Sequence, residues 1–212
     1  MKPKDLKSPF TWNTRYPCSA NGVVYVPEYY FEHDQSIMPK LPDMPICVEF
    51  CSGNGDWIIA RAQAEPEKFW IAVEMQFCRV RKIWSKRENH GLKNLLIVCG
   101  KAEDFLDHYI QGVVFDEAYI NFPDPWEKDR QAKHRIVQEP FMGNLKKKMK
   151  SGGTATLVTD HEVYAKQMSE VMQASWEPQE ISSDISGYGY SFFADLFIKQ
   201  EKNISKQVYV NS

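Results

Sequence analysis

Short apolar runs alternate with longer amphipathic stretches over most of the chain. From Ile46 onward the runs have the length of strands, and the stretches between them have the length and spacing of helices. The predicted strands are residues 46–51, 69–74, 95–99, 115–122 and 154–159, and the predicted helices are residues 57–64, 78–88, 102–109, 137–149 and 163–172. Repeated strand–helix units predict an α/β fold with a mostly parallel sheet.

Both ends of the chain depart from this alternation. Residues 1–45 are rich in proline and aromatic residues without a helical or strand period, which predicts an irregular N-terminal arm. Near the C-terminus, apolar runs at residues 192–198 and 207–210 predict an antiparallel hairpin. Because no repeat or low-complexity linker is found, residues 46–212 are expected to form one domain.

Composition restricts the class of protein. The chain has 212 residues, of which 43% are hydrophobic and 25% charged, as in ordinary folded proteins. It has neither an apolar run long enough to span a membrane nor a signal-peptide pattern, so a cytoplasmic location without membrane association is expected. The five cysteines lack the spacing of a zinc site, which predicts free thiols and no metal. The sequence does not decide between a monomer and a homodimer.

The net charge of −2 does not by itself indicate a polyanionic partner, so such a partner must be argued from local patches. Basic residues concentrate in two segments, residues 128–150 and the predicted helix at 78–88. Phosphate contacts from such segments would bind nucleic acid irrespective of sequence. Solvated helix faces are the alternative interpretation.

Ligands of parallel sheets bind where strands end and loops lead into helices, so these loops are the first candidates for a site. The segment Glu49–Asp56 leaves the first predicted strand, and Gly53 and Gly55 allow the backbone to approach a ligand at a helix N-terminus. The segment fits the dinucleotide-binding glycine pattern poorly because Cys51 occupies the first glycine position. A plain strand-to-helix turn is the alternative.

Glu74 closes the second predicted strand, nineteen positions after Gly55. An acidic residue at about this spacing binds the ribose hydroxyls in nucleoside-binding folds, because a carboxylate offers two acceptor oxygens. The alternative is a surface glutamate that opens the next helix.

The segment Asn121–Trp126 follows a very apolar strand and is the most specific motif of the chain. Two prolines on either side of Asp124 favour a stiff, extended loop from which the carboxylate projects, and Trp126 offers a flat face for stacking. The alternative is a rigid turn with a packed tryptophan. Thr159 and Asp160 end the fifth predicted strand, where they could belong to a site. The alternative is that one of them caps the following helix.

These residues resemble the bacterial tRNA (guanine-N7)-methyltransferases, a family of class I enzymes that depend on S-adenosylmethionine. The resemblance runs from about Ile46 to Met172. It is carried by Phe122-Pro-Asp-Pro-Trp-Glu-Lys128, followed by Arg130, Lys133, Arg135, Gln138, the pair Gly152-Gly153 and Thr159-Asp160. The family pattern reads FPDPWxKxRHxKRRxVQ, so that Gln131 and His134 stand where a histidine and an arginine are expected.

The resemblance implies a Rossmann-like, mostly parallel seven-stranded sheet with helices on both faces and a C-terminal antiparallel hairpin. It implies transfer of a methyl group from S-adenosylmethionine to N7 of guanosine 46 in the variable loop of tRNA, with Asp124 at the catalytic centre. The donor-binding residues implied are Glu49, Ser52, Gly53, Asn54, Gly55, Glu74, Met75, Lys101, Ala102, Asn121 and Asp124. The substrate-binding residues implied are Lys128, Arg130, Lys133, Arg135, Asp160, Ser191 and Phe193.

The chain departs from the family at two positions. Lys101 replaces an aspartate that contacts the adenine side of the donor, and a lysine cannot accept a hydrogen bond from the adenine amino group. Either a backbone carbonyl or Glu103 accepts it instead, or the donor binds more weakly. Near the C-terminus, Ala194 replaces the glutamate of the family's TxFE motif.

Three other functions are compatible with parts of the sequence. The two departures would suit a non-catalytic tRNA-binding homologue. The Asp-Pro-aromatic loop also resembles that of adenine or amino methyltransferases, for which the basic segment after Trp126 would be incidental surface. An NAD-dependent oxidoreductase is the least favoured because of Cys51.

Overall fold

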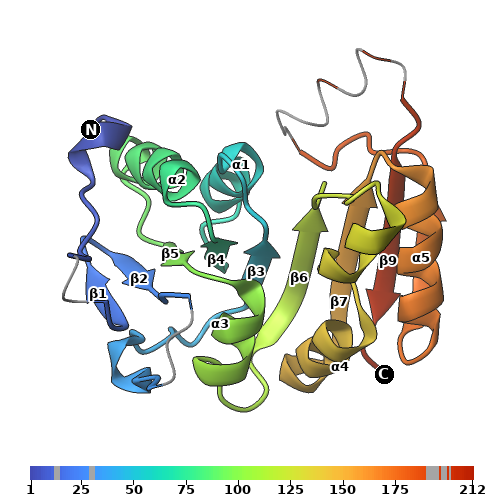
Figure 1. The fold of residues 1–212 in the computed structure, drawn as a ribbon, viewed down its shortest axis with the longest axis horizontal. Helices are drawn as coiled ribbons and strands as arrows, with labels where there is room; N and C mark the ends of the chain where they lie inside the picture. The colour runs from blue at the N-terminus through green and yellow to red at the C-terminus, as the bar shows by residue number, and fades with distance from the viewer. Residues whose placement is uncertain (12–14, 29–31, 190–195, 197–199, 201) are drawn as a thin grey trace. The chain divides into compact units, whose positions relative to one another are not determined.

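The computed structural model describes residues 1–11, 15–28, 32–189, 196, 200 and 202–212. The chain divides into two compact units, Met1–Gln111 and Gly112–Ser212. Each unit contains its own strands and helices (Figure 1).

The first unit holds strands in the order β1-β2-β5-β4-β3. Its strands are β1 (Cys18–Ala20), β2 (Val23–Tyr25), β3 (Ile46–Phe50), β4 (Phe69–Glu74) and β5 (Leu95–Cys99). Its helices are α1 (Asp56–Ala64), α2 (Phe77–His90) and α3 (Ala102–His108), with short 3₁₀ helices η1 (Pro3–Asp5) and η2 (Gln35–Ile37). β1 and β2 pair antiparallel, whereas β2, β5, β4 and β3 are parallel to one another.

The central strands of this unit are mostly apolar, with Glu49 in β3 and Glu74 at the end of β4 as the exceptions. Every residue of β3 and β5 is buried, as expected for parallel strands that are covered on both faces. The helices α1 and α2 both pack against β4, and α2 also packs against β5. α2 ends at Gly91, whose positive φ of 64° is the left-handed conformation that favours glycine after a helix.

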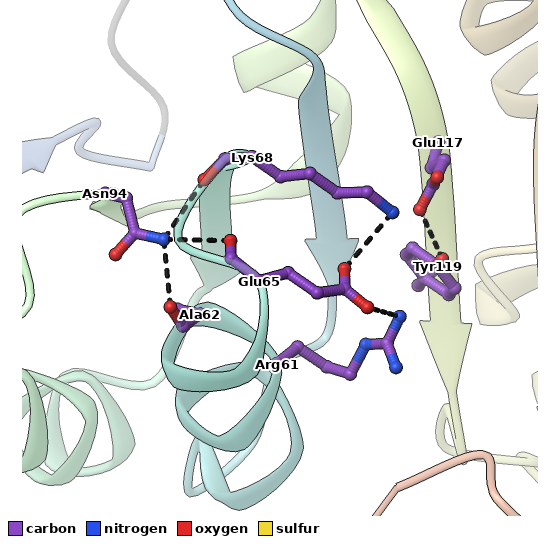
Figure 2. Close-up of polar contacts among 7 residues, drawn as sticks. All are labelled: Arg61, Ala62, Glu65, Lys68, Asn94, Glu117 and Tyr119. Carbon is purple, nitrogen blue, oxygen red and sulfur yellow. Dashed lines mark hydrogen bonds and ion pairs between the residues drawn. The ribbon is translucent and has the colours of Figure 1, made fainter.

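A polar cluster fixes the loop between α1 and β4 (Figure 2). The side-chain amide of Asn94 lies 2.9, 3.3 and 3.0 Å from the carbonyl oxygens of Ala62, Glu65 and Lys68. The Glu65 carboxylate pairs with Arg61 and, at 3.1 Å, with the Lys68 ammonium. These contacts satisfy the carbonyls at the C-terminal end of α1 and hold the start of β4.

The second unit holds strands in the order β6-β7-β9-β8. Its strands are β6 (Phe115–Asn121), β7 (Met149–Thr159), β8 (Glu177–Ser182) and β9 (Ser205–Val210), and its helices are η3 (Asp129–His134), α4 (Glu139–Lys148) and α5 (Glu162–Gln173). β6 and β7 are parallel, whereas β9 runs antiparallel to both β7 and β8. α5 packs against β7, β8 and β9.

The structure confirms the mixed α/β fold with mostly parallel strands and antiparallel strands at the C-terminus. The five strands and five helices predicted between residues 46 and 172 are all present. Their ends agree with the prediction within two residues, except that β7 begins at Met149, five residues before its predicted start. The division into an arm over residues 1–45 and a domain over residues 46–212 remains a prediction.

Two parts of the fold differ from the prediction. Residues 1–45 contain β1 and β2, which extend the parallel strands through the pairing of β2 with β5. The partner of β9 at the C-terminus is β8, a polar strand that the sequence pattern did not reveal. The predicted strand at residues 192–198 lies outside the described residues, apart from Leu196.

Within the described part of the chain, no helix combines the length and the apolar character needed to cross a bilayer.

Candidate active site

The turn after β3 is fastened to the end of β4 by Glu74. The backbone N–H of Gly53 donates to the Glu74 carboxylate at 2.9 Å, and the N–H of Gln76 donates to its other oxygen at 2.8 Å. Glu74 is only 4% exposed. The structure therefore brings together the glycine turn and the acidic strand end that the sequence singled out separately.

The two glycines of this turn have different surroundings. Both have positive φ, 56° at Gly53 and 76° at Gly55, a conformation that other residues rarely adopt. A Cβ added at Gly55 would lie 2.7 Å from the Ile83 side chain, so this glycine permits close packing of the turn on α2. A Cβ added at Gly53 would meet only the carbonyl of Cys51, at 3.9 Å, so Gly53 leaves space beside the turn.

The other predicted residues of this turn are held by the protein itself. The Ser52 hydroxyl donates to the carbonyl of Glu49 at 3.0 Å, and the Glu49 side chain is buried within β3. The amide oxygen of Asn54 accepts from Lys82 at 3.0 Å, and its backbone carbonyl accepts from Lys86 at 2.8 Å. The turn is thus rigid.

A cavity of about 610 Å³ lies at the carboxyl ends of β2, β4 and β5. Its volume is within the range of small-molecule sites. Met75 and Lys101, both predicted to bind the donor, line it, whereas Ala102 is buried at the start of α3. Arm residues complete the lining, and among them Glu28 pairs with Lys101 at 2.6 Å. Sequence reasoning missed Glu28, because nothing in the irregular arm indicates which residue reaches the strand ends.

Two residues that line this cavity have raised pKa values. Burial, and to a lesser extent the charge of Glu74, raises the pKa of the Cys99 thiol to about 12. Burial likewise raises the pKa of the Tyr25 phenol to about 12. Both groups are therefore neutral at physiological pH, and Cys99 is not a nucleophile there.

The loop after β6 has an unusual backbone. Phe122 and Trp126 have positive φ values of 47° and 45°, which are rare for bulky residues. Between them, Pro123 and Pro125 flank Asp124, whose side chain is exposed. The loop therefore presents a single carboxylate on a stiff backbone, as the sequence predicts.

The buried side chain of Arg135 binds the backbone of this loop. Its guanidinium donates to the Pro125 carbonyl at 2.6 Å and to the amide oxygen of Gln167. Its carbon centre lies 4.9 Å from the Tyr164 ring centroid, and the residue is only 8% exposed. Arg135 was expected on the substrate surface, but its contacts place it in a supporting position under the loop.

The remaining predicted residues of this unit have distinct positions. Asn121 is buried at the end of β6 and accepts from the Tyr188 hydroxyl at 2.7 Å. The basic residues that follow the loop are exposed; they are Lys128, Arg130 and Lys133. Asp160 pairs with Lys202 at 2.5 Å. Ser191 and Phe193, like Ala194, lie outside the described residues.

The alternative interpretation of Thr159 or Asp160 as the cap of α5 is not what the structure shows. The side chain that accepts from the first turn is that of His161, which bonds the Tyr164 N–H at 3.2 Å. Thr159 instead accepts from the N–H of His161 at 3.2 Å. Across the described residues, no cluster of three or more histidine, cysteine, aspartate or glutamate side chains could hold a metal ion.

Comparison with solved structures identifies the fold. The chain superposes on the 16S rRNA methyltransferase KamB with a TM-score of 0.60 at 12% identity, over 79% of this chain and 88% of that one. It superposes on a SAM-dependent methyltransferase from Aquifex aeolicus with a TM-score of 0.57 at 13% identity, over 79% and 82% of the two chains. At these identities the likeness shows the class I methyltransferase fold alone.

Comparison with known sequences identifies the family. Residues 43–186 match the family model described as "Putative methyltransferase". The tRNA (guanine-N(7)-)-methyltransferase of Chlamydia felis is 43% identical, over 96% of this chain and 95% of that protein. The enzyme of the same name from Chlamydia trachomatis is 42% identical over the same shares. A similarity of this extent, joined to the glycine turn, Glu74 and the loop around Asp124, places the chain in the tRNA (guanine-N7)-methyltransferase family.

Proposed function

We propose that this chain methylates N7 of guanosine 46 in the variable loop of tRNA, with S-adenosylmethionine as methyl donor, in the cytoplasm. The support is the name shared by relatives that match nearly the whole chain. The observation that carries the proposal within this structure is the exposed carboxylate of Asp124 on its stiff loop.

The residues of the first unit fit the donor. The space beside Gly53 would admit a ligand close to the backbone, and the Glu74 carboxylate at the same turn could accept from ribose hydroxyls. Ser52, Asn54 and Gly55 would keep the turn in shape, and Glu49 is buried in β3 just before it. Met75 and Lys101 line the cavity and would face the donor there. Ala102 and Asn121 are assigned to donor binding on the family resemblance alone.

For methyl transfer to guanine N7, the protein needs mainly to position the reactants and to compensate charge. The donor supplies an electrophilic methyl group carried on a sulfonium. Guanine N7 has an in-plane lone pair and no proton to lose, so no general base is required. Holding the two reactants in line can account for about 7–11 kcal/mol of the barrier. The residues of the chain therefore act by binding, orienting and compensating charge.

Asp124 is assigned two roles. Its carboxylate can accept from guanine N1–H or N2–H, a donor pattern that adenine does not offer. Because the purine becomes cationic as N7 is methylated, a carboxylate fixed beside it stabilises the developing charge. The stiff backbone matters here, since an electrostatic contribution of this kind depends on a group that need not reorient.

The exposed Lys128, Arg130 and Lys133 follow the same loop and would bind tRNA phosphates. We further assign Asp160, Ser191 and Phe193 to the substrate side on the family resemblance. Arg135 is assigned to the support of the loop on the basis of its contacts.

The proposal is tested with Asp124→Asn and unmodified tRNA as the methyl acceptor. The expected kcat falls by about a hundredfold, the scale of losing one preorganised electrostatic contact, whereas the affinity for S-adenosylhomocysteine stays within about twofold. Asp43→Asn is the matched control, because Asp43 is also exposed and also follows a proline. Full activity of Asp124→Asn would refute the role of Asp124.

The alternative functions give different outcomes. Methyl transfer to duplex DNA but not to tRNA would indicate an amino methyltransferase. Binding of tRNA without any heat of binding for S-adenosylmethionine would indicate a non-catalytic homologue.

A further inference from the structure

The cavity at the carboxyl ends of β2, β4 and β5 has walls suited to a flat, aromatic ligand. Phe10, Tyr25 and Phe77 line it, together with Met75, whose side chain is 58% exposed. The rings of Phe10 and Tyr25 meet edge to face with centroids 5.8 Å apart. Aromatic and thioether groups favour the faces of a purine through stacking and sulfur–aromatic contacts.

An ion pair supplies the polar groups of this cavity. Glu28 follows β2, and Lys101 follows β5. These strands are parallel neighbours, and the N–H of Val26 donates to the carbonyl of Cys99 at 2.9 Å. The segments that follow β2 and β5 therefore leave the sheet at the same end. The Lys101 ammonium lies 2.6 Å from the Glu28 carboxylate, and the two side chains are 34% and 38% exposed.

The pair offers an acceptor and a donor side by side. A carboxylate can accept at two oxygens and an ammonium can donate three hydrogens, so each can serve both its partner and a ligand. The edge of adenine carries an amino donor next to the N1 acceptor. The carboxylate of Glu28 therefore matches the amino group, and the ammonium of Lys101 matches the ring nitrogen.

We propose that Glu28, oriented by Lys101, is the residue through which this chain recognises the adenine amino group of the methyl donor. This inference rests on the proposed function, because it assumes that the donor occupies this cavity. It assigns the arm a direct part in donor selection, in addition to its structural pairing through β2.

The competing carboxylates are less well placed. Among the described residues that line the cavity, Glu28 is the only acidic one. Glu103, in the first turn of α3, is exposed and does not belong to that lining. Glu74 is only 4% exposed and does not belong to that lining either.

The test compares two ligands by titration calorimetry: S-adenosylhomocysteine and its deamino analogue, in which hydrogen replaces the 6-amino group. The wild-type chain is expected to bind the deamino analogue roughly tenfold or more weakly, the scale of a hydrogen bond to a charged group. Glu28→Ala is expected to bind both ligands with the same affinity. Glu103→Ala, the matched control, is expected to keep the wild-type preference.

Glu28→Gln tests the acceptor itself, because its amide carbonyl can still accept; it should retain part of the preference. Thermal unfolding without ligand checks that each variant is folded. A preference for the amino group that persists in Glu28→Ala overturns the inference and leaves the proposed function standing. Failure of the wild-type chain to bind S-adenosylhomocysteine overturns the donor site, and the inference with it.

Discussion

The backbone at Phe122 and Trp126 shows how single residues shape the candidate site. Positive φ at bulky residues costs free energy, of the order of 1–3 kcal/mol each, and persists only where the surroundings enforce it. The prolines on either side of Asp124 restrict the loop, and the guanidinium of Arg135 binds the Pro125 carbonyl. The carboxylate of Asp124 is therefore exposed on a loop whose backbone is restricted.

Arg135 is predicted to act on catalysis through this loop. Arg135→Lys removes the forked donor set that holds the Pro125 carbonyl and Gln167, so kcat for tRNA methylation should fall by about tenfold or more. The affinity for S-adenosylhomocysteine should not change. Steady-state kinetics with tRNA and calorimetry with S-adenosylhomocysteine check both expectations.

Arg61→Lys serves as the control, because Arg61 pairs with Glu65 at the C-terminal end of α1, outside the candidate site, and the variant should keep kcat. If Arg135→Lys also kept the wild-type kcat while remaining folded, the supporting role assigned to Arg135 would be wrong.

The raised pKa of the Cys99 thiol predicts that the folded chain loses stability at alkaline pH. Its pKa is about 12 in the folded chain, against an ordinary value of 9.0. Between these values the unfolded chain has lost the proton that the folded chain retains, so the free energy of unfolding falls as pH rises. The contribution is complete below pH 9 and disappears as pH approaches 12. Tyr25 acts in the same direction.

Urea unfolding between pH 8 and 11 measures this effect. Cys99→Ala should reduce the decline in unfolding free energy by about 1 kcal/mol per pH unit above pH 9. Cys78→Ala, which alters an exposed thiol, should leave the decline as in the wild type. An unchanged slope in Cys99→Ala would show that its thiol does not titrate as described.

The sequence predicts some of these residues and misses others for identifiable reasons. In the sequence, the glycine turn and Glu74 lie at the ends of two successive predicted strands, and the hydrogen bond from the Gly53 N–H to Glu74 shows that these two sites lie together. Arg135 could not be distinguished from its solvated basic neighbours, because burial depends on how the loop folds back. Glu28 carries no local signal at all, since only the pairing of β2 with β5 brings it to Lys101.

At the scale of elements, the strands that the pattern revealed are those buried on both faces. β5 is a continuous apolar run, and β3 and β4 are apolar except for one glutamate each. β8, in contrast, is exposed, polar and contains Pro178, as is typical of an edge strand. β1 and β2 are only three residues each, and their turn is held from α2 by Arg87, which donates to the carbonyls of Asn21 and Gly22. Contacts of this kind cannot be read from periodicity.

The connection from α1 to β4 predicts a purely structural effect. Asn94→Ala removes the amide that binds the carbonyls of Ala62, Glu65 and Lys68 (Figure 2). The free energy of unfolding should fall by about 1–3 kcal/mol, because three partly buried carbonyl acceptors lose their donor. Since this cluster lies at the amino end of β4 and the cavity lies at its carboxyl end, donor affinity should be preserved.

Urea unfolding and calorimetry of Asn94→Ala measure the two quantities, with Asn203→Ala, at an exposed position, as the control. A large loss of donor affinity without loss of stability would contradict this assignment.

At the scale of the whole molecule, net charge is a poor guide to the partner. The chain carries a net charge of −2, yet its family is named for an activity on tRNA, which is a polyanion. Many basic residues serve internal contacts: Arg87 binds the β1–β2 turn, Lys82 binds Asn54, and Lys150 pairs with Asp116. The exposed set after the Asp124 loop is therefore the better candidate for phosphate contacts.

Replacement of this set predicts a change in salt dependence. In Lys128→Gln/Arg130→Gln/Lys133→Gln, tRNA should bind more weakly, and the slope of log affinity against log salt should decrease by about 2 to 3, the sum of three phosphate contacts. Filter binding at several salt concentrations measures the slope. The control Lys4→Gln/Lys40→Gln/Lys93→Gln removes the same charge from other exposed positions and should keep the slope. An unchanged slope in the first variant would assign tRNA binding to another surface.

The position of the methyl group on the product tests the proposed guanine-N7 transfer. Unmodified tRNA is incubated with the protein and S-adenosylmethionine, reduced with borohydride and cleaved with aniline, which breaks the chain at 7-methylguanosine. Methylation at N7 of guanosine 46 should give donor-dependent cleavage at that position, and none in a transcript with adenosine there. Cleavage at a different guanosine, or methylation without any cleavage, would contradict the proposed transfer.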